Sequence, residues 1–114
     1  MHIAYISHDE LNRCDAEGMA SAGIIIESRH CLAAPNGEYD AYVYDLDFWP
    51  VDERDRLLRH LTTTCLPAPV AVHSYSLLRR QAMALGRNGV RVHHRLEPAI
   101  FAGLRNPVTS ESSD

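Results

Sequence analysis

A short apolar run in the middle of the chain constrains the fold most. Residues Ala41 to Asp45 read A-Y-V-Y-D and lie between Asn36-Gly37 and Pro50. Tyrosine and valine favour strands, and a run without polar alternation is typical of a strand covered on both faces, as in a parallel sheet. Ligands of such sheets gather beyond the carboxyl ends of the strands. Asp45, at that end, and Asp47 are therefore the first candidates for a functional site.

The other segments predict strands that alternate with helices. Strands are expected at residues 2–6, 24–26, 41–45, 70–72 and 90–92, and helices at 10–22, 51–61, 77–85 and 97–104. This alternation predicts an α/β fold with right-handed crossovers, namely a three-layer, doubly wound parallel five-stranded sheet of flavodoxin-like order 2-1-3-4-5. The eight residues from Arg29 to Asn36 leave room only for a reduced second helix. We expect residues 1–105 to form a single domain and 106–114 a polar, disordered tail.

Composition narrows the possible functions. The chain has 114 residues, 46% of them hydrophobic, which suits one domain, and its net charge of −4 argues against nucleic acid as a partner. It shows no bilayer-spanning run and no signal-peptide pattern, so we expect a cytoplasmic protein without membrane contact. The three cysteines form no C-x-x-C pair and are expected to be buried free thiols. All eleven basic residues are arginine, so chemistry that needs a lysine is excluded.

Polar residues follow four of the five predicted strands, and this topology brings them to one crevice. They are Ser7, His8, Asp9, Asp45, Asp47, His73, Ser74, His93 and His94. Imidazole and carboxylate suit a transition metal, so His8, His73 and His93 could bind one together with Asp45. Alternatively, the histidines form a pH-sensitive crevice. Phe48 and Trp49, just beyond Asp45, are expected to cover the core as a lid.

Three motifs resemble the receiver domain of bacterial response regulators. Y-D-A-Y-V-Y-D at 39–45 resembles the family's strand that ends in a phosphoacceptor aspartate, and P-V-A-V-H-S at 69–74 resembles its strand that ends in a switch hydroxyl. A-M-A-L-G-R-N-G-V at 82–90 resembles the turn before its fifth strand. The resemblance implies a two-component signalling module with Asp45 as phosphoacceptor, Ser74 as switch hydroxyl and Mg²⁺ held by Asp45 and Asp9.

The chain departs from the family pattern in three places. Ser7 and His8 stand where the family has an acidic pair, His93 stands near the place of its lysine, and the Asp45–Pro50 loop is one residue longer. We therefore interpret the chain as an atypical receiver, or pseudo-receiver, in which phosphorylation of Asp45 stays an open question. It would bind a partner protein or its own copy through the face of the fourth strand, the fifth strand and the helix between them at 77–85, which is the fourth helix when the reduced second one is counted. Tyr75, Leu77 and Leu78 would lie near this face.

An enzymatic alternative starts from the first strand. A-Y-I-S-H-D-E at 4–10 resembles the first strand of TIR domains, some of which cleave NAD. The match covers Tyr5 to His8, and the chain has no counterpart of that family's catalytic glutamate helix. A flavodoxin is disfavoured because the loop after the first strand lacks a phosphate-binding Ser/Thr/Gly pattern.

Overall fold

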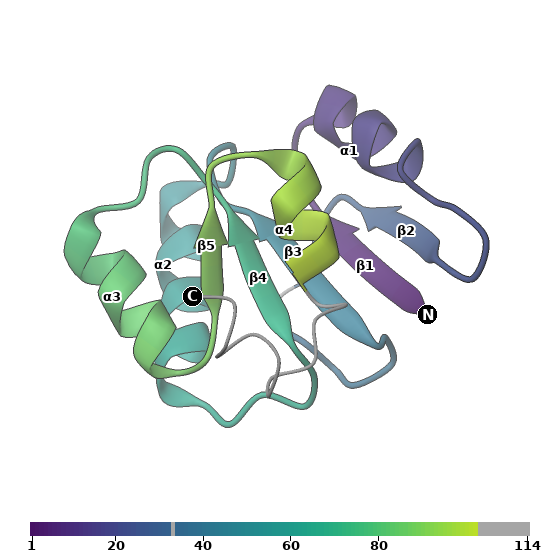
Figure 1. The fold of residues 1–114 in the computed structure, drawn as a ribbon. Helices are drawn as coiled ribbons and strands as arrows, with labels where there is room; N and C mark the ends of the chain where they lie inside the picture. Colours follow the sequence, from purple (N-terminus) through teal and green to yellow (C-terminus); the bar gives the residue numbers. More distant parts are fainter. Residues whose placement is uncertain (33, 103–114) are drawn as a thin grey trace.

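The computed structural model describes residues 1–32 and 34–102 as a parallel sheet between two layers of helices (Figure 1). The strand order is β2-β1-β3-β4-β5, which confirms the predicted doubly wound, flavodoxin-like topology. The strands are β1 (His2–Ile6), β2 (Ile25–Arg29), β3 (Ala41–Asp45), β4 (Val70–His73) and β5 (Arg91–His93). The helices are α1 (Glu10–Glu17), α2 (Val51–Thr63), α3 (Arg79–Arg87) and α4 (Leu96–Ala102).

Strand β3 lies at the centre of the sheet. All five of its residues are buried, and it pairs with β1 on one side and with β4 on the other. The register sets Ile6 beside Tyr44, Asp45 beside His73, and His73 beside His93. The strands therefore end almost level, and the residues that follow them meet at one edge of the sheet.

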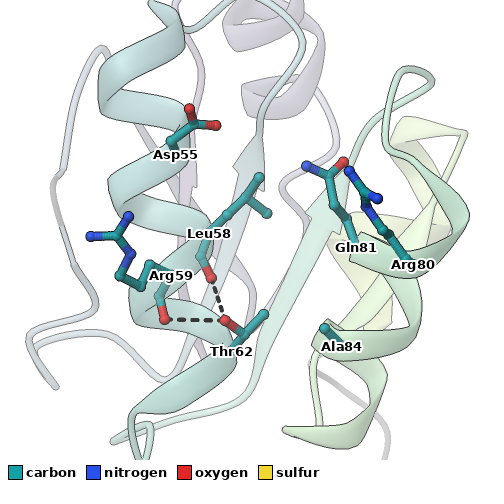
Figure 2. Close-up of a pocket in the computed structure, with 7 residues that line it drawn as sticks. All are labelled: Asp55, Leu58, Arg59, Thr62, Arg80, Gln81 and Ala84. Carbon is teal, nitrogen blue, oxygen red and sulfur yellow. Dashed lines mark hydrogen bonds between the residues drawn. The ribbon is translucent and has the colours of Figure 1, made fainter.

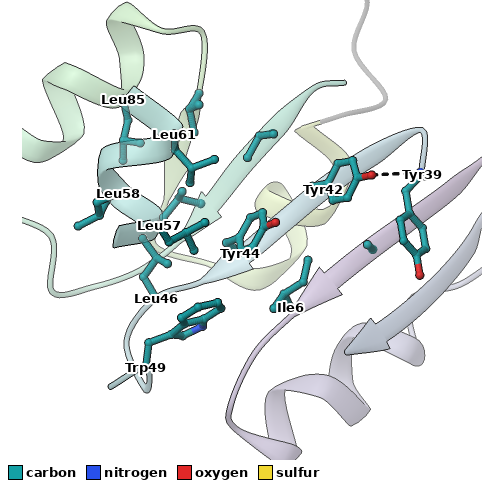
Figure 3. Packing of buried hydrophobic residues seen from close by; sticks show 14 residues of the cluster. Ile6, Tyr39, Tyr42, Tyr44, Leu46, Trp49, Leu57, Leu58, Leu61 and Leu85 are labelled. Atoms are coloured by element: carbon teal, nitrogen blue, oxygen red, sulfur yellow. Dashed lines mark hydrogen bonds between the residues drawn. The ribbon is translucent and has the colours of Figure 1, made fainter. Parts of the chain in front are cut away.

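The two faces of the sheet carry separate hydrophobic clusters. In Figure 1, α4 lies in front of the sheet and α2 behind it. On the first face, Ala16 of α1 and Ile100 of α4 pack with the strands. On the second face, Leu57 and Leu61 of α2 and Leu85 of α3 pack against the strands beside Tyr44, as Figure 3 shows. Full burial of each leucine stabilises the fold by about 1.5–3 kcal/mol. None of the helices in the described part of the chain could cross a membrane.

The connection between β2 and β3 differs most from a regular α/β unit. Its described residues form no helix, so the reduced second helix of the prediction is absent from them. Instead, the Tyr42 hydroxyl donates to Asn36 Oδ1 (2.6 Å) and accepts from the Tyr39 amide (3.2 Å; Figure 3). Gly37 makes the turn with φ of 82°. Tyr39 and Tyr42 thus pack in the core cluster of the second face, where a regular α/β unit would pack a helix.

Several element boundaries differ from the prediction. Helix α1 ends at Glu17, before Gly18, although apolar spacing suggested an end at 22. Helix α3 runs through Gly86, and Gly89, with φ of 80°, is where the chain turns. Strand β2 continues to Arg29 because edge positions accept polar residues. The predicted end of the last helix at 103–104 and the predicted tail at 106–114 lie outside the described residues.

Candidate functional site

Asp45 lies at the end of β3 with only 1% of its surface exposed. Its Oδ2 atom accepts hydrogen bonds from Ser7 Oγ (2.8 Å) and Asn12 Nδ2 (2.9 Å), and its Oδ1 atom accepts one from the Asp47 amide (3.2 Å). Hydrogen bonds to a carboxylate are roughly twice as strong as neutral ones, so these donors offset much of the cost of burying it. The carboxylate is thus held by neutral donors.

Asp9 has a local structural role beside this group. It is the N-cap of α1, and its Oδ2 atom accepts from the Asn12 amide (3.2 Å). The contact with Asp45 comes instead from the Asn12 side chain. Sequence reasoning missed Asn12, although its place in the first turn after a strand end could have indicated it. Arg13 Nη1 donates to the Ser7 carbonyl (2.7 Å) and so fixes the loop that carries Ser7.

Asp47 organises the segment that follows β4. Its Oδ1 atom accepts from Ser74 Oγ (2.5 Å) and Ser76 Oγ (2.7 Å), and its Oδ2 atom accepts from the Tyr75 amide (2.9 Å). Partial burial opposes ionisation, but the hydrogen bonds from Ser74, Tyr75 and Ser76 outweigh it and lower the pKa of the Asp47 carboxyl. The hydroxyl predicted to act as a switch therefore points to Asp47 and is bonded to an anion.

The histidines at the strand ends lie in different surroundings. His73 is buried, and its Nδ1 atom is 3.1 Å from the Tyr5 hydroxyl. Burial and the negative charge of Asp45 raise the pKa of Tyr5, so the phenol stays neutral. His94 Nδ1 is 3.0 Å from the Ser74 carbonyl oxygen, and its ring stacks on Tyr75.

His8 lies apart from these histidines. Its ring contacts those of His30 and Trp49, with centroids 4.3 and 4.8 Å away. Among the described residues, the ligand atoms close enough to share a metal ion belong to His8, Cys31 and Glu53. The set of His8, His73, His93 and Asp45 expected from the sequence does not form such a group.

Two expectations about single side chains change with the structure. Trp49 is 7% exposed and covers the core as predicted, whereas its neighbour Phe48 is 58% exposed and does not. The prediction of buried thiols is wrong, because Cys14, Cys31 and Cys65 are all exposed. Cys14 lies on α1, and Cys31 and Cys65 lie in loops. The spacing of the cysteines alone does not reveal their exposure.

A cavity of about 440 Å³ lies between α2 and α3, away from the strand ends (Figure 2). Its lining includes Asp55 and Arg59 of α2 and Arg80 of α3. The Thr62 hydroxyl at its wall donates to the Leu58 carbonyl (2.8 Å), so its proton is already engaged within α2. None of the predicted site residues lines this cavity, so it is separate from the site at the strand ends.

The face formed by β4, α3 and β5 presents apolar side chains to solvent. Tyr75 is 69% exposed, Leu78 52% and Met83 53%. Leu77, by contrast, is partly buried against the core. Arg79 and Arg80 lie beside Leu78 in the first turn of α3 and are also exposed. This face therefore combines apolar side chains with positive charge.

Comparisons with known proteins identify the fold. No protein-family model matches the sequence, and no curated protein matches it. A response regulator from Burkholderia pseudomallei, whose crystal structure contains a phosphorylated aspartic acid, a calcium ion and citrate, matches with a TM-score of 0.66 at 14% identity, over 98% of this chain and 71% of that one. The ChxR receiver domain from Chlamydia trachomatis matches with a TM-score of 0.60 at 12% identity, over 98% and 95%. The chain therefore has the fold of response-regulator receiver domains.

Proposed function

We propose that this protein is an atypical receiver-like signalling module that acts by protein–protein interaction without requiring phosphorylation of Asp45. One observation carries the proposal: the Ser74 hydroxyl already donates to the carboxylate of Asp47. The resemblance implies a switch hydroxyl that a phosphoryl group recruits. Here an acid two residues beyond Asp45 supplies the anion, so the segment after β4 is held in place without a phosphoryl group.

The surroundings of Asp45 support this proposal. Phosphoryl transfer depends on cations that neutralise the phosphoryl oxygens. Asp45 is in contact with a hydroxyl and an amide, and the chain has no lysine. A Mg²⁺ ion at Asp45 would compete with the Ser7, Asn12 and Asp47 donors for the carboxylate oxygens. Phosphorylation of Asp45 would therefore start from an unfavourable arrangement.

The proposed binding face is that of β4, α3 and β5. Tyr75 and Leu78 are exposed there, and the stacked ring of His94 supports Tyr75. Exposed aromatic and apolar side chains flanked by arginine suit a protein surface that carries apolar and acidic groups. The chain carries 15 acidic residues, so a second copy is one candidate for such a surface.

Amide NMR with Mg²⁺ and beryllofluoride, a phosphoryl mimic, tests the dependence on phosphate. Wild type is compared with Asp45→Asn, which keeps the shape of the side chain and removes its charge. We expect no shifts centred on Asp45 and Ser74 in either protein. Shifts that spread from Asp45 to α3 in wild type and vanish in Asp45→Asn would contradict the proposal.

Sedimentation velocity over a range of concentrations tests the binding face. If copies associate, Leu78→Glu should abolish association, while Leu11→Glu, at a still more exposed leucine on α1, should leave it unchanged. A wild type that stays monomeric would exclude self-association, and a different protein would then be the proposed partner. Association unaffected by Leu78→Glu would place the interface elsewhere.

The TIR-like alternative rests on a match at Tyr5 to His8, and two of these residues are buried and bonded within the domain. Tyr5 and Ser7 are fully buried and hydrogen-bonded to His73 and Asp45. Incubation with NAD is the direct test, and we expect no NAD consumption.

A further inference from the structure

Three potential metal ligands converge near the amino end of α2. His8 follows β1, Cys31 follows β2, and Glu53 lies in the first turn of α2. One ligand atom from each lies within 4.8 Å of the other two. Cys31 Sγ is 4.0 Å from Glu53 Oε1. Segments far apart in sequence thus bring a thiol, an imidazole and a carboxylate together.

Polar atoms without partners surround the same place. His8 Nε2, Tyr44 Oη and Trp49 Nε1 are buried and have no hydrogen-bond partner within the described ranges. The rings are neighbours, because the Trp49 centroid lies 4.8 Å from His8 and 6.2 Å from Tyr44, and Figure 3 shows Tyr44 and Trp49 side by side. Leaving a buried polar atom without a partner is unfavourable, so such atoms rarely gather without reason. An imidazole nitrogen of His8 can bind a metal ion, whereas Trp49 Nε1 can only donate a hydrogen bond to a group held there.

We propose that His8, Cys31 and Glu53 form a binding site for a transition metal ion such as Zn²⁺, with solvent as the fourth ligand. Thiolate and imidazole favour such ions over Mg²⁺ or Ca²⁺. Zinc bonds of about 2.0–2.3 Å in a tetrahedron place ligand atoms about 3.3–3.8 Å apart. The ligand atoms therefore need to approach by at most about 1.5 Å, which the exposed Cys31 and the long Glu53 side chain can provide.

This site is distinct from the one that the receiver resemblance implies. It shares His8 with the histidine and aspartate set expected from the sequence, and it uses neither Asp45 nor Asp9. The metal would join the segment after β2, which is not helical, to the start of α2. The inference does not depend on the proposed signalling function, and its failure would leave that proposal untouched.

Titration of the reduced protein with Co²⁺, followed by its absorption spectrum, tests the site. We expect a thiolate-to-cobalt charge-transfer band and the visible bands of a tetrahedral ion, both saturating at one equivalent and displaced by Zn²⁺. Cys31→Ser should lose the charge-transfer band and bind Zn²⁺ more than about 100-fold more weakly, because losing even an outer partner of a ligand costs 10–100-fold. Cys31 is exposed, so this variant should fold normally.

Matched variants separate this site from incidental thiol binding. Cys14→Ser and Cys65→Ser remove the other two exposed thiols and should leave the spectrum unchanged. Glu53→Gln should weaken Zn²⁺ binding at least about tenfold. The proposal is wrong if wild type gives no charge-transfer band, if Cys31→Ser keeps the band, or if Cys14→Ser or Cys65→Ser removes it.

Discussion

Replacement of Asp47 by alanine should destabilise the protein more than its half-buried position suggests. The carboxylate accepts from the Ser74 and Ser76 hydroxyls and from the Tyr75 amide. Tyr75 and Ser76 are exposed and can bond to water once the carboxylate is gone. The loss of these two contacts should therefore reduce the free energy of unfolding by only about 0.5–1 kcal/mol. Ser74 is fully buried, and the loss of its acceptor costs about 1–3 kcal/mol.

Solvent screening at the half-buried Asp47 places the sum near the lower end of these ranges. We therefore expect Asp47→Ala to reduce the free energy of unfolding by about 2 kcal/mol and to lower Tm by about 8 °C. Urea denaturation followed by Trp49 fluorescence measures this, because Trp49 is the only tryptophan and is buried when the protein is folded. Asp15→Ala, at an exposed acid on α1, is the control and should change stability by less than about 0.5 kcal/mol.

A double-mutant cycle isolates the contact between the two side chains. When Ser74→Ala is added to Asp47→Ala, the buried hydroxyl without a partner is removed. The double variant should therefore lose about 1 kcal/mol less than the sum of the single variants. Additive losses, or a loss below about 0.5 kcal/mol for Asp47→Ala alone, would refute the idea that Asp47 holds the segment after β4.

Two further predictions concern pH and the ends of the helices. Folding lowers the pKa of Asp47. The contribution of Asp47 to the free energy of unfolding is therefore complete above its unfolded pKa of about 4, and it is lost as the pH falls through its folded pKa. The stability difference between wild type and Asp47→Asn, measured by urea denaturation, should thus shrink below about pH 4, and a constant difference would contradict it. Asn88 Nδ2 donates to the carbonyl oxygens of Leu61 (2.7 Å) and Thr64 (2.8 Å), so Asn88→Ala should cost about 1–2 kcal/mol. Arg79→Ala, at an exposed residue of the same helix, is its control, and equal losses in both would exclude the carbonyl contacts as the cause.

The sequence predicted the centre of the sheet better than its periphery. The bounds of β1 and β3 match the expectation residue by residue, because strands covered on both faces leave an uninterrupted apolar run. The ends of β2 and α1 were misjudged, since polar residues at an edge and glycine after a helix obey weaker rules.

The candidate site was predicted in its location and not in its contacts. Topology alone places Asp45, Asp47 and Ser74 at one edge of the sheet. The pairing of Ser74 with Asp47, and of Asn12 with Asp45, depends on rotamers and on the path of loops. The convergence of Cys31 with His8 was equally hidden, because it depends on how the chain runs after β2 when no helix forms there.

The connection from β2 to β3 also affects how the native state fluctuates. Strand β2 is hydrogen-bonded to one neighbour only, β1, and no helix in the described part of this connection covers it. Release of β2 breaks that single ladder, the packing of Ile26 beside Ala16 of α1 and the bond from Ser28 to Glu17, while β3 keeps both of its neighbours. Local opening of β2 is therefore a smaller event than global unfolding, and the chain divides into a weakly held edge and a cooperative remainder.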